Sequence, residues 1–147
     1  MCNTDVAIGE RQSVGAAVFR NKEGVVTSMH TTHLCHNDPL SGEIAALCWG
    51  AEVATIQGLK NVIFQYDLSS AVSAVRQKGH HIPALQHNIQ AQVAKFLNLT
   101  NKLNLWEASW IPKKFNCVAH SVAKWAIRSN QFGNIDLSNF NSSLLDG

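Results

Sequence analysis

The sequence has little net charge, no paired cysteine motif and no long apolar run. Its formal net charge of +2 at pH 7 is too small to indicate polyanion binding by the whole surface, so such binding would depend on local patches. We find no signal peptide and no apolar run long enough to cross a bilayer. The cysteines form no CxxC pair, and we expect reduced thiols in an intracellular protein, nuclear or cytoplasmic. They are Cys2, Cys35, Cys48 and Cys117.

Internal repeats, low-complexity tracts and linkers are also missing. A chain of 147 residues with 46% hydrophobic content is long enough for one domain with its own core. We predict a folded domain over residues 1–130 and a tail over 131–147, which is rich in Asn and Ser and packs loosely from Gly133 onward. The chain starts only a few residues before Asp5, so we expect a monomer or a domain of a longer polypeptide.

The first third of the chain has the pattern of an antiparallel three-strand meander. Short runs rich in Val, Ile and Ala alternate with polar turns, which is typical of neighbouring strands joined by hairpins. The three predicted strands are 5–8, 14–19 and 25–29.

Helices and two further strands follow. Asp38 and Pro39 are a typical entry pair for a helix that ends at Gly58. The later predicted elements are a strand at 62–64 covered on both faces, helices at 68–77 and 83–97, a strand at 103–111, and a last helix that Asn116 caps. This order predicts an α/β fold with a five-stranded mixed sheet, the meander plus parallel strands, flanked by helices.

Three carboxylates and one imidazole fall at the edges of four of these elements. In this arrangement Asp5 and Asp67 are on adjacent central strands, Glu43 is in the first turns of the helix that crosses them, and His120 is in the first turn of the last helix. Hard divalent ions prefer carboxylate oxygens, and in-line phosphodiester hydrolysis uses two such ions about 3.5–4 Å apart. Taken singly, the aspartates could be turn formers, Glu43 could complement the helix dipole, and His120 could bond to the neighbouring strand.

Four motifs in order carry a family resemblance over nearly the whole chain. They are the strand 15–19 with Arg20-Asn21-Lys22-Glu23-Gly24, the helix segment 43–52, Tyr66-Asp67-Leu68-Ser69, and the segment 116–123 from Asn116 to Ala123. With these motifs the chain resembles the ribonuclease H superfamily, most closely the reverse-transcriptase-associated ribonuclease H-like domains abundant in plants.

The resemblance implies a metal-dependent endonuclease that hydrolyses the RNA strand of RNA–DNA hybrids by a two-metal-ion mechanism. It makes Asp5, Glu43, Asp67 and His120 the catalytic and metal-binding residues for two Mg²⁺ or Mn²⁺ ions. Three departures are visible: His120 replaces a carboxylate, the segment 110–115 contains no histidine, and the helix from Pro83 is polar rather than basic. The alternatives are therefore a catalytically weak or silent module that binds hybrid or RNA, and a protein-interaction domain.

Two further kinds of site are suggested by side chains other than Asp5, Glu43, Asp67 and His120. For contact with the nucleic-acid backbone we predict Lys113, Lys114, Arg76, Lys78 and Asn116. The histidines at 30, 33 and 36 with Cys35 suggest a zinc site, but a second ligand pair is missing and His30 and His33 alternate to opposite faces of a strand. A polar strand end and loop is the favoured interpretation.

Overall fold

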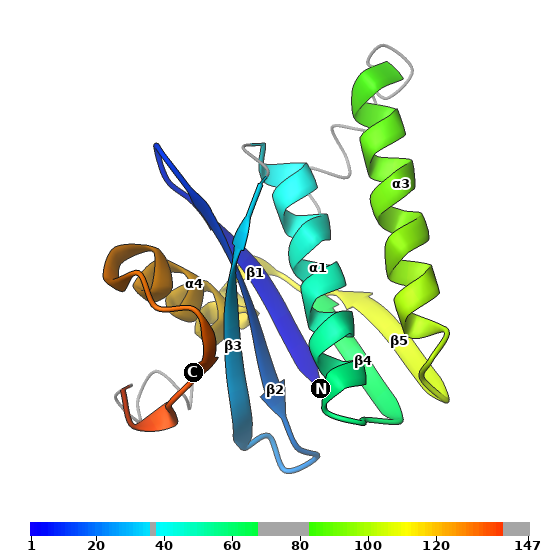
Figure 1. Ribbon diagram of the computed structural model, residues 1–147. Coiled ribbons are helices and arrows are strands. Elements are labelled where there is room, and N and C mark those ends of the chain that lie inside the picture. The colour runs from blue at the N-terminus through cyan, green and yellow to red at the C-terminus, as the bar shows by residue number, and fades with distance from the viewer. Residues whose placement is uncertain (36–37, 68–82, 140–147) are drawn as a thin grey trace.

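The computed structural model describes residues 1–35, 38–67 and 83–139, which form one mixed sheet with helices on both faces (Figure 1). The strands lie in the order β5-β4-β1-β2-β3-β6. The strands are β1 (Cys2–Ile8), β2 (Ser13–Arg20), β3 (Val26–Leu34), β4 (Asn61–Tyr66), β5 (Leu105–Trp110) and β6 (Gly133–Ile135). The helices are α1 (Pro39–Ile56), α3 (Pro83–Thr100) and α4 (Cys117–Ser129), with short 3-10 turns η2 (Lys113–Phe115) and η3 (Leu137–Asn139).

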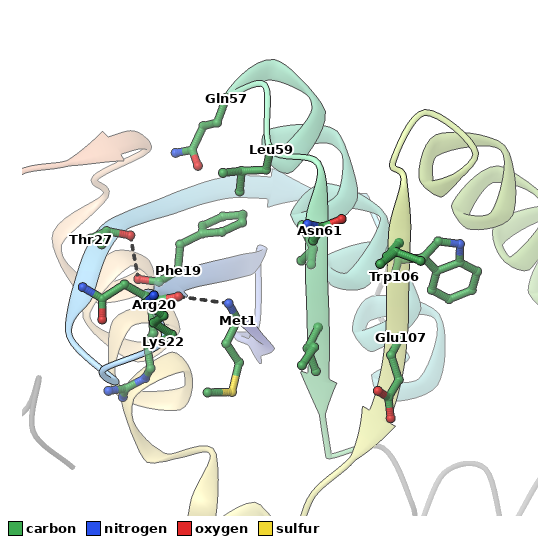
Figure 2. A pocket seen from close by; sticks show the side chains of 14 residues that line it. Met1, Phe19, Arg20, Lys22, Thr27, Gln57, Leu59, Asn61, Trp106 and Glu107 are labelled. Carbon is green, nitrogen blue, oxygen red and sulfur yellow. Dashed lines mark hydrogen bonds between the residues drawn. The ribbon is translucent and has the colours of Figure 1, made fainter.

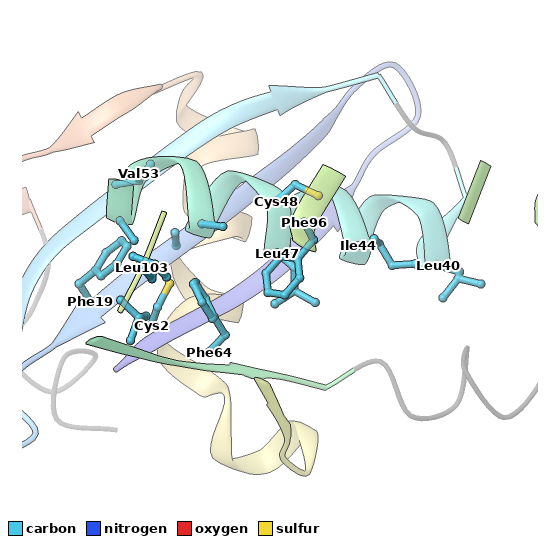
Figure 3. Packing of buried hydrophobic residues seen from close by; sticks show 14 residues of the cluster. Cys2, Phe19, Leu40, Ile44, Leu47, Cys48, Val53, Phe64, Phe96 and Leu103 are labelled. Carbon is cyan, nitrogen blue, oxygen red and sulfur yellow. The ribbon is translucent and has the colours of Figure 1, made fainter. Parts of the chain in front are cut away.

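The sheet separates two hydrophobic cores. On one face, α1 and α3 cover the core around Phe19, Phe64 and Phe96 (Figure 3). On the other face, α4 packs on β1 and β2 around Val18 and Val122. The strands β1, β2 and β3 form the predicted antiparallel meander, whereas β4 runs parallel to both β1 and β5. The predicted α/β class with a mixed sheet is confirmed.

Helix α1 lies close to the sheet because its inner face is built of small residues. The helix begins as predicted, with Pro39 in the first turn and the Asp38 carboxylate accepting from the Ser41 amide at 2.9 Å. A methyl group added at Gly50 would lie 2.9 Å from Thr4 Cγ2 and 3.1 Å from Cys2 Sγ, so this glycine sets the approach of the helix to β1. The close approach places the first turns of α1 next to β1.

The sheet has six strands, so the predicted number of five was wrong. The sixth, β6, pairs antiparallel with Met29 to Thr31 of β3, and Ile135 is buried in the core under α4. The expectation of a loose tail was therefore wrong for Gly133–Ile135. The predicted helix at 68–77, together with Arg76 and Lys78, lies outside the described residues.

In the middle of β4, one face of the strand is covered and the other is exposed. The prediction of a strand buried on both faces was therefore wrong. Val62 and Phe64 are buried, but Ile63 is 46% exposed because α4 packs over β1 and β2. Ile63 lines a hollow of about 860 Å³ with Met1 and Leu105, drawn in Figure 2. This hollow lies at the start of β4, whereas Asp67 follows the end of that strand. Among the described residues, no helix combines the length and apolarity needed to cross a bilayer.

Candidate metal centre

Three carboxylates from separate elements converge at the end of β4. Asp5 is in β1, Glu43 is one turn into α1, and Asp67 directly follows β4. Each offers an oxygen such that the three atoms lie within 4.8 Å of one another. The parallel pairing of β1 with β4 and the close packing of α1 on the sheet produce this arrangement. The structure thus brings together the three acids that the sequence predicted to be neighbours.

His120 lies at the rim of this cluster, in the first turn of α4. Its Nδ1 is 2.9 Å from Asp5 Oδ2, and its side chain is 32% exposed whereas that of Asp5 is 4% exposed. An ionised carboxylate can only accept a hydrogen bond, so Nδ1 is the donor when Asp5 is ionised, in either the neutral or the protonated imidazole. Among the described residues, the group whose ligand atoms all lie within 4.8 Å of one another consists of the three carboxylates and does not include His120.

The electrostatics of the cluster suit a bound cation. Burial, followed by the neighbouring charges of Asp67 and Asp5, raises the pKa of Glu43 to about 7, and nearby Lys113 opposes the rise. Burial and the charge of Asp67 also raise the pKa of Asp5. Among the described residues, Glu43 Oε2 is a buried oxygen without a hydrogen-bond partner. Divalent ions bound to these carboxylate oxygens would offset the repulsion between the three negative charges, and Glu43 Oε2 could bind such an ion. The donor set therefore fits Mg²⁺ or Mn²⁺.

Asn116 precedes α4 as predicted, but its side chain contacts this cluster instead of capping the helix. It occupies the N-cap position of α4, but its side chain makes no capping bond. Its Nδ2 donates to the Thr4 carbonyl at 2.8 Å and to Asp67 Oδ2 at 3.1 Å. At 1% exposure it cannot contact a nucleic acid on the surface, so it is removed from the predicted interface.

A comparison with known protein families shows which family the chain belongs to. Residues 3–126 match the reverse transcriptase-like family. The chain belongs to this family of ribonuclease H-like domains. No curated protein sequence matches it significantly.

Solved structures similar to this reverse transcriptase-like domain share its fold at low sequence identity. Ribonuclease H1 from the halophilic archaeon Halobacterium salinarum NRC-1 has a TM-score of 0.72 at 15% identity, covering 87% of this chain and 96% of the other. LC11-RNase H1, solved in complex with an RNA/DNA hybrid, has a TM-score of 0.69 at 15% identity, with coverage of 88% and 96%. The N-terminal RNase H domain of rv2228c from Mycobacterium tuberculosis has a TM-score of 0.64 at 13% identity, with coverage of 89% and 100%. The predicted RNase H-like fold is confirmed.

Two pairs of basic side chains flank the acids of this reverse transcriptase-like domain. Lys113 and Lys114 are exposed in η2, and Lys113 is close enough to Glu43 to lower its pKa. On the other side, Lys124 and Arg128 line a hollow of about 420 Å³ together with His120. The sequence analysis missed this second pair, although its spacing of four residues from His120 places all three on one face of a helix.

His30 and His33 of the rejected zinc interpretation have other partners in this domain, and His36 lies outside the described residues. His30 is buried, with Nε2 at 2.8 Å from Gln57 Nε2 and 3.1 Å from Ser28 Oγ. The exposed His33 stacks on Phe132 with ring centroids 3.8 Å apart. Both rings therefore take part in packing around β3.

Proposed function

We propose that this domain is a metal-dependent endonuclease that hydrolyses the RNA strand of RNA–DNA hybrids. The convergence of the Asp5, Glu43 and Asp67 oxygens within 4.8 Å, in a chain of this family, carries the proposal. The structural similarity to LC11-RNase H1, which was solved with an RNA/DNA hybrid, supports the choice of substrate class. The buried Glu43 Oε2, which has no hydrogen-bond partner in the described part of the chain, supports a role for this cluster in binding cations.

In this proposal the three carboxylates hold two Mg²⁺ or Mn²⁺ ions and His120 adds Nε2 to their ligands. The bound ions would stabilise charge on the attacking and leaving oxygens of the phosphodiester. The 2.9 Å bond between His120 Nδ1 and Asp5 Oδ2 holds the ring beside the three carboxylates. Glu43 would also contact the RNA 2′-hydroxyl, and selectivity for RNA would come from that group rather than from reading base edges.

Basic residues on both sides of the acids would bind the nucleic-acid backbone. Lys113 and Lys114 are the predicted pair, and the exposed Lys124 and Arg128 add positive charge further along α4 from His120. Phosphate contacts from such side chains fix the position of a duplex without reading its sequence. Because the net charge of the chain is only +2, this local arrangement is what can attract a polyanion.

A cleavage and binding experiment tests the proposal directly. Labelled RNA–DNA hybrid, double-stranded RNA and double-stranded DNA are each incubated with the protein in Mg²⁺, in Mn²⁺ and in EDTA. We expect cleavage of the RNA strand of the hybrid in the presence of either ion, and only a gel shift in EDTA. A shift without cleavage in any ion would indicate a silent binding module. Neither cleavage nor a shift would indicate a protein-interaction domain.

His120 should determine which ion supports the faster reaction. Imidazole suits Mn²⁺ better than Mg²⁺, which prefers a full shell of oxygens. We expect wild-type cleavage to be faster in Mn²⁺ than in Mg²⁺ by roughly tenfold, equivalent to about 1.4 kcal/mol in the barrier. His120→Asp should reduce this ratio by improving the Mg²⁺ rate.

Initial rates over a range of ion concentrations provide the measurement for His120. The variant Ser129→Asp is the control, because it adds a carboxylate at the exposed end of α4 without replacing the imidazole. An ion preference that is the same in the wild type and in His120→Asp would mean that His120 is not a ligand.

A further inference from the structure

The main-chain pairing between β1 and β4 ends before it reaches Asp5 and Asp67. The parallel ladder of β1 and β4 consists of Cys2 with Phe64 and Asn3 with Gln65. Asp5 and Asp67 lie beyond it, where their like charges repel each other. The pairing of β4 with β5 continues to Tyr66, so the main chain before Asp67 is fixed from that side, but no main-chain pairing between β1 and β4 reaches the aspartates.

A chain of three side-chain amides continues the connection beyond the ladder. Asn3 Nδ2 donates to Gln65 Oε1 at 3.0 Å and to Asn116 Oδ1 at 3.2 Å. Asn116 Nδ2 then donates to the Thr4 carbonyl at 2.8 Å and to Asp67 Oδ2 at 3.1 Å. The network connects β1, the end of β4 and the start of α4. Thr4 directly precedes Asp5, so one amide group contacts both aspartate-bearing segments.

The orientation of the Asn116 amide is fixed by its partners. A side-chain amide has two donors on nitrogen and an acceptor oxygen. The oxygen of Asn116 receives the Asn3 bond, and its nitrogen faces the Thr4 carbonyl and the Asp67 carboxylate. Turning the amide over would place its oxygen against two other oxygens and leave the Asn3 donor facing a donor. The second N–H of Asn116 is thus directed at Asp67.

Because the Asn116 side chain takes part in this network, it does not cap α4. An asparagine at the N-cap normally accepts from a main-chain amide of the first turn, but here its side chain is turned toward Asp67. The Asn116 side chain therefore contacts the acid cluster rather than the first turn of its own helix.

We propose that Asn116, oriented by Asn3, is a positioning residue that holds the Asp67 carboxylate in place relative to Asp5 and thereby sets the affinity of the site for divalent ions. This inference rests on the proposed function of the acid cluster. Supporting bonds behind metal ligands typically change ion affinity by about 10–100-fold when they are removed. The effect should appear without any nucleic acid present.

Calorimetric titration of Mn²⁺ into the full chain measures this affinity. Asn116→Leu has a similar size but no donor, and we expect it to weaken Mn²⁺ binding by about 10–100-fold. Asn3→Ala leaves Asn116 in place but removes the bond that orients it, so we expect a smaller, several-fold loss. All titrations are made well below the melting temperature of each variant, so that loss of stability alone does not change the result.

Thr31→Val is the matched control. Thr31 is as buried as Asn116, and its hydroxyl donates to the Gln131 carbonyl at 2.7 Å, away from the acids. This variant loses a buried hydrogen bond but should bind Mn²⁺ as the wild type does. Wild-type affinity in both Asn116→Leu and Asn3→Ala would overturn the inference. If Asn116→Leu does not fold, wild-type affinity in Asn3→Ala alone would do so.

A second readout does not depend on bound ions. In EDTA, the side-chain amide protons of Asn116 should give separate, slowly exchanging signals by NMR, and Asp67→Ala should shift one of them strongly. Signals that exchange as fast as those of an exposed amide would show that the network does not form, which overturns the inference. Protected signals in a wild-type protein that binds no Mn²⁺ would refute the proposed function, and with it the role of Asn116 in ion binding.

Discussion

Replacing Asp67 by asparagine is expected to abolish cleavage of RNA–DNA hybrids without unfolding the protein. Asp67 shares its site with Asp5 and Glu43 within 4.8 Å, so under the proposed function its charge would be needed to bind cations. Ions in such sites stabilise transition-state charge by several kcal/mol, so losing a ligand should slow the reaction by about 100-fold or more. The amide oxygen of the new side chain can still accept the bond from Asn116 Nδ2, so this contact is kept.

The stability of Asp67→Asn separates a role in chemistry from a role in folding. Removing one of three mutually repelling carboxylates should leave the metal-free melting temperature unchanged or slightly raised. Glu107→Gln makes the same carboxylate-to-amide change on the exposed strand β5 and should retain wild-type activity. Hybrid cleavage by Asp67→Asn at the wild-type rate would rule out the two-metal proposal.

The acid cluster could be predicted from the sequence because each acid is tied to a local signal. Asp38 and Pro39 mark the start of α1 and therefore place Glu43 one turn into it, while the apolar run Val62–Phe64 places Asp67 at a strand end. Once the strands are known to be central and adjacent, convergence follows from the topology of a parallel pair. These inferences use helix entry and strand periodicity, which depend mainly on neighbouring residues.

The features that were missed depend on distant residues. Strand β6 has only three residues, two of them glycine and asparagine, which have low strand propensity, and it forms through pairing with β3. Asn116 has the local preference of a helix cap, but its bonds to Thr4 and Asp67 come from segments far away in the chain. The exposure of Ile63 depends on where α4 packs, which the apolar pattern of β4 cannot indicate.

The metal-free protein should lose stability as the pH rises from about 4.5 to about 7, and Glu43 should be a main cause. Burial and the charges of Asp67 and Asp5 raise the pKa of Glu43 from 4.5 to about 7. Between these values the folded protein binds a proton at Glu43 that the unfolded chain has already released. The contribution of this group to the free energy of unfolding is therefore greatest at low pH, falls across this window, and is level above it.

Comparison with Glu43→Gln isolates this contribution from the other titrating groups. Relative to the wild type in EDTA, the variant should gain stability as the pH rises through the window, by on the order of 1 kcal/mol after allowance for solvent screening. That gain corresponds to about 2–4 °C in melting temperature for a chain of this size. Saturating Mg²⁺ should stabilise the wild type more at pH 8 than at pH 5, because protons compete with the ion for the carboxylates.

Thermal denaturation followed by circular dichroism from pH 4.5 to 8.5, in EDTA and in Mg²⁺, measures both effects. Glu52→Gln is the control, since it makes the same change further along α1, away from the acid cluster. The gain with rising pH should be specific to Glu43→Gln. Parallel curves for the wild type and Glu43→Gln across the whole range would mean that burial and the neighbouring carboxylates do not raise the pKa of Glu43. The electrostatic argument for a cation at this site would then fail, even if the three carboxylates remain as close as the structure places them.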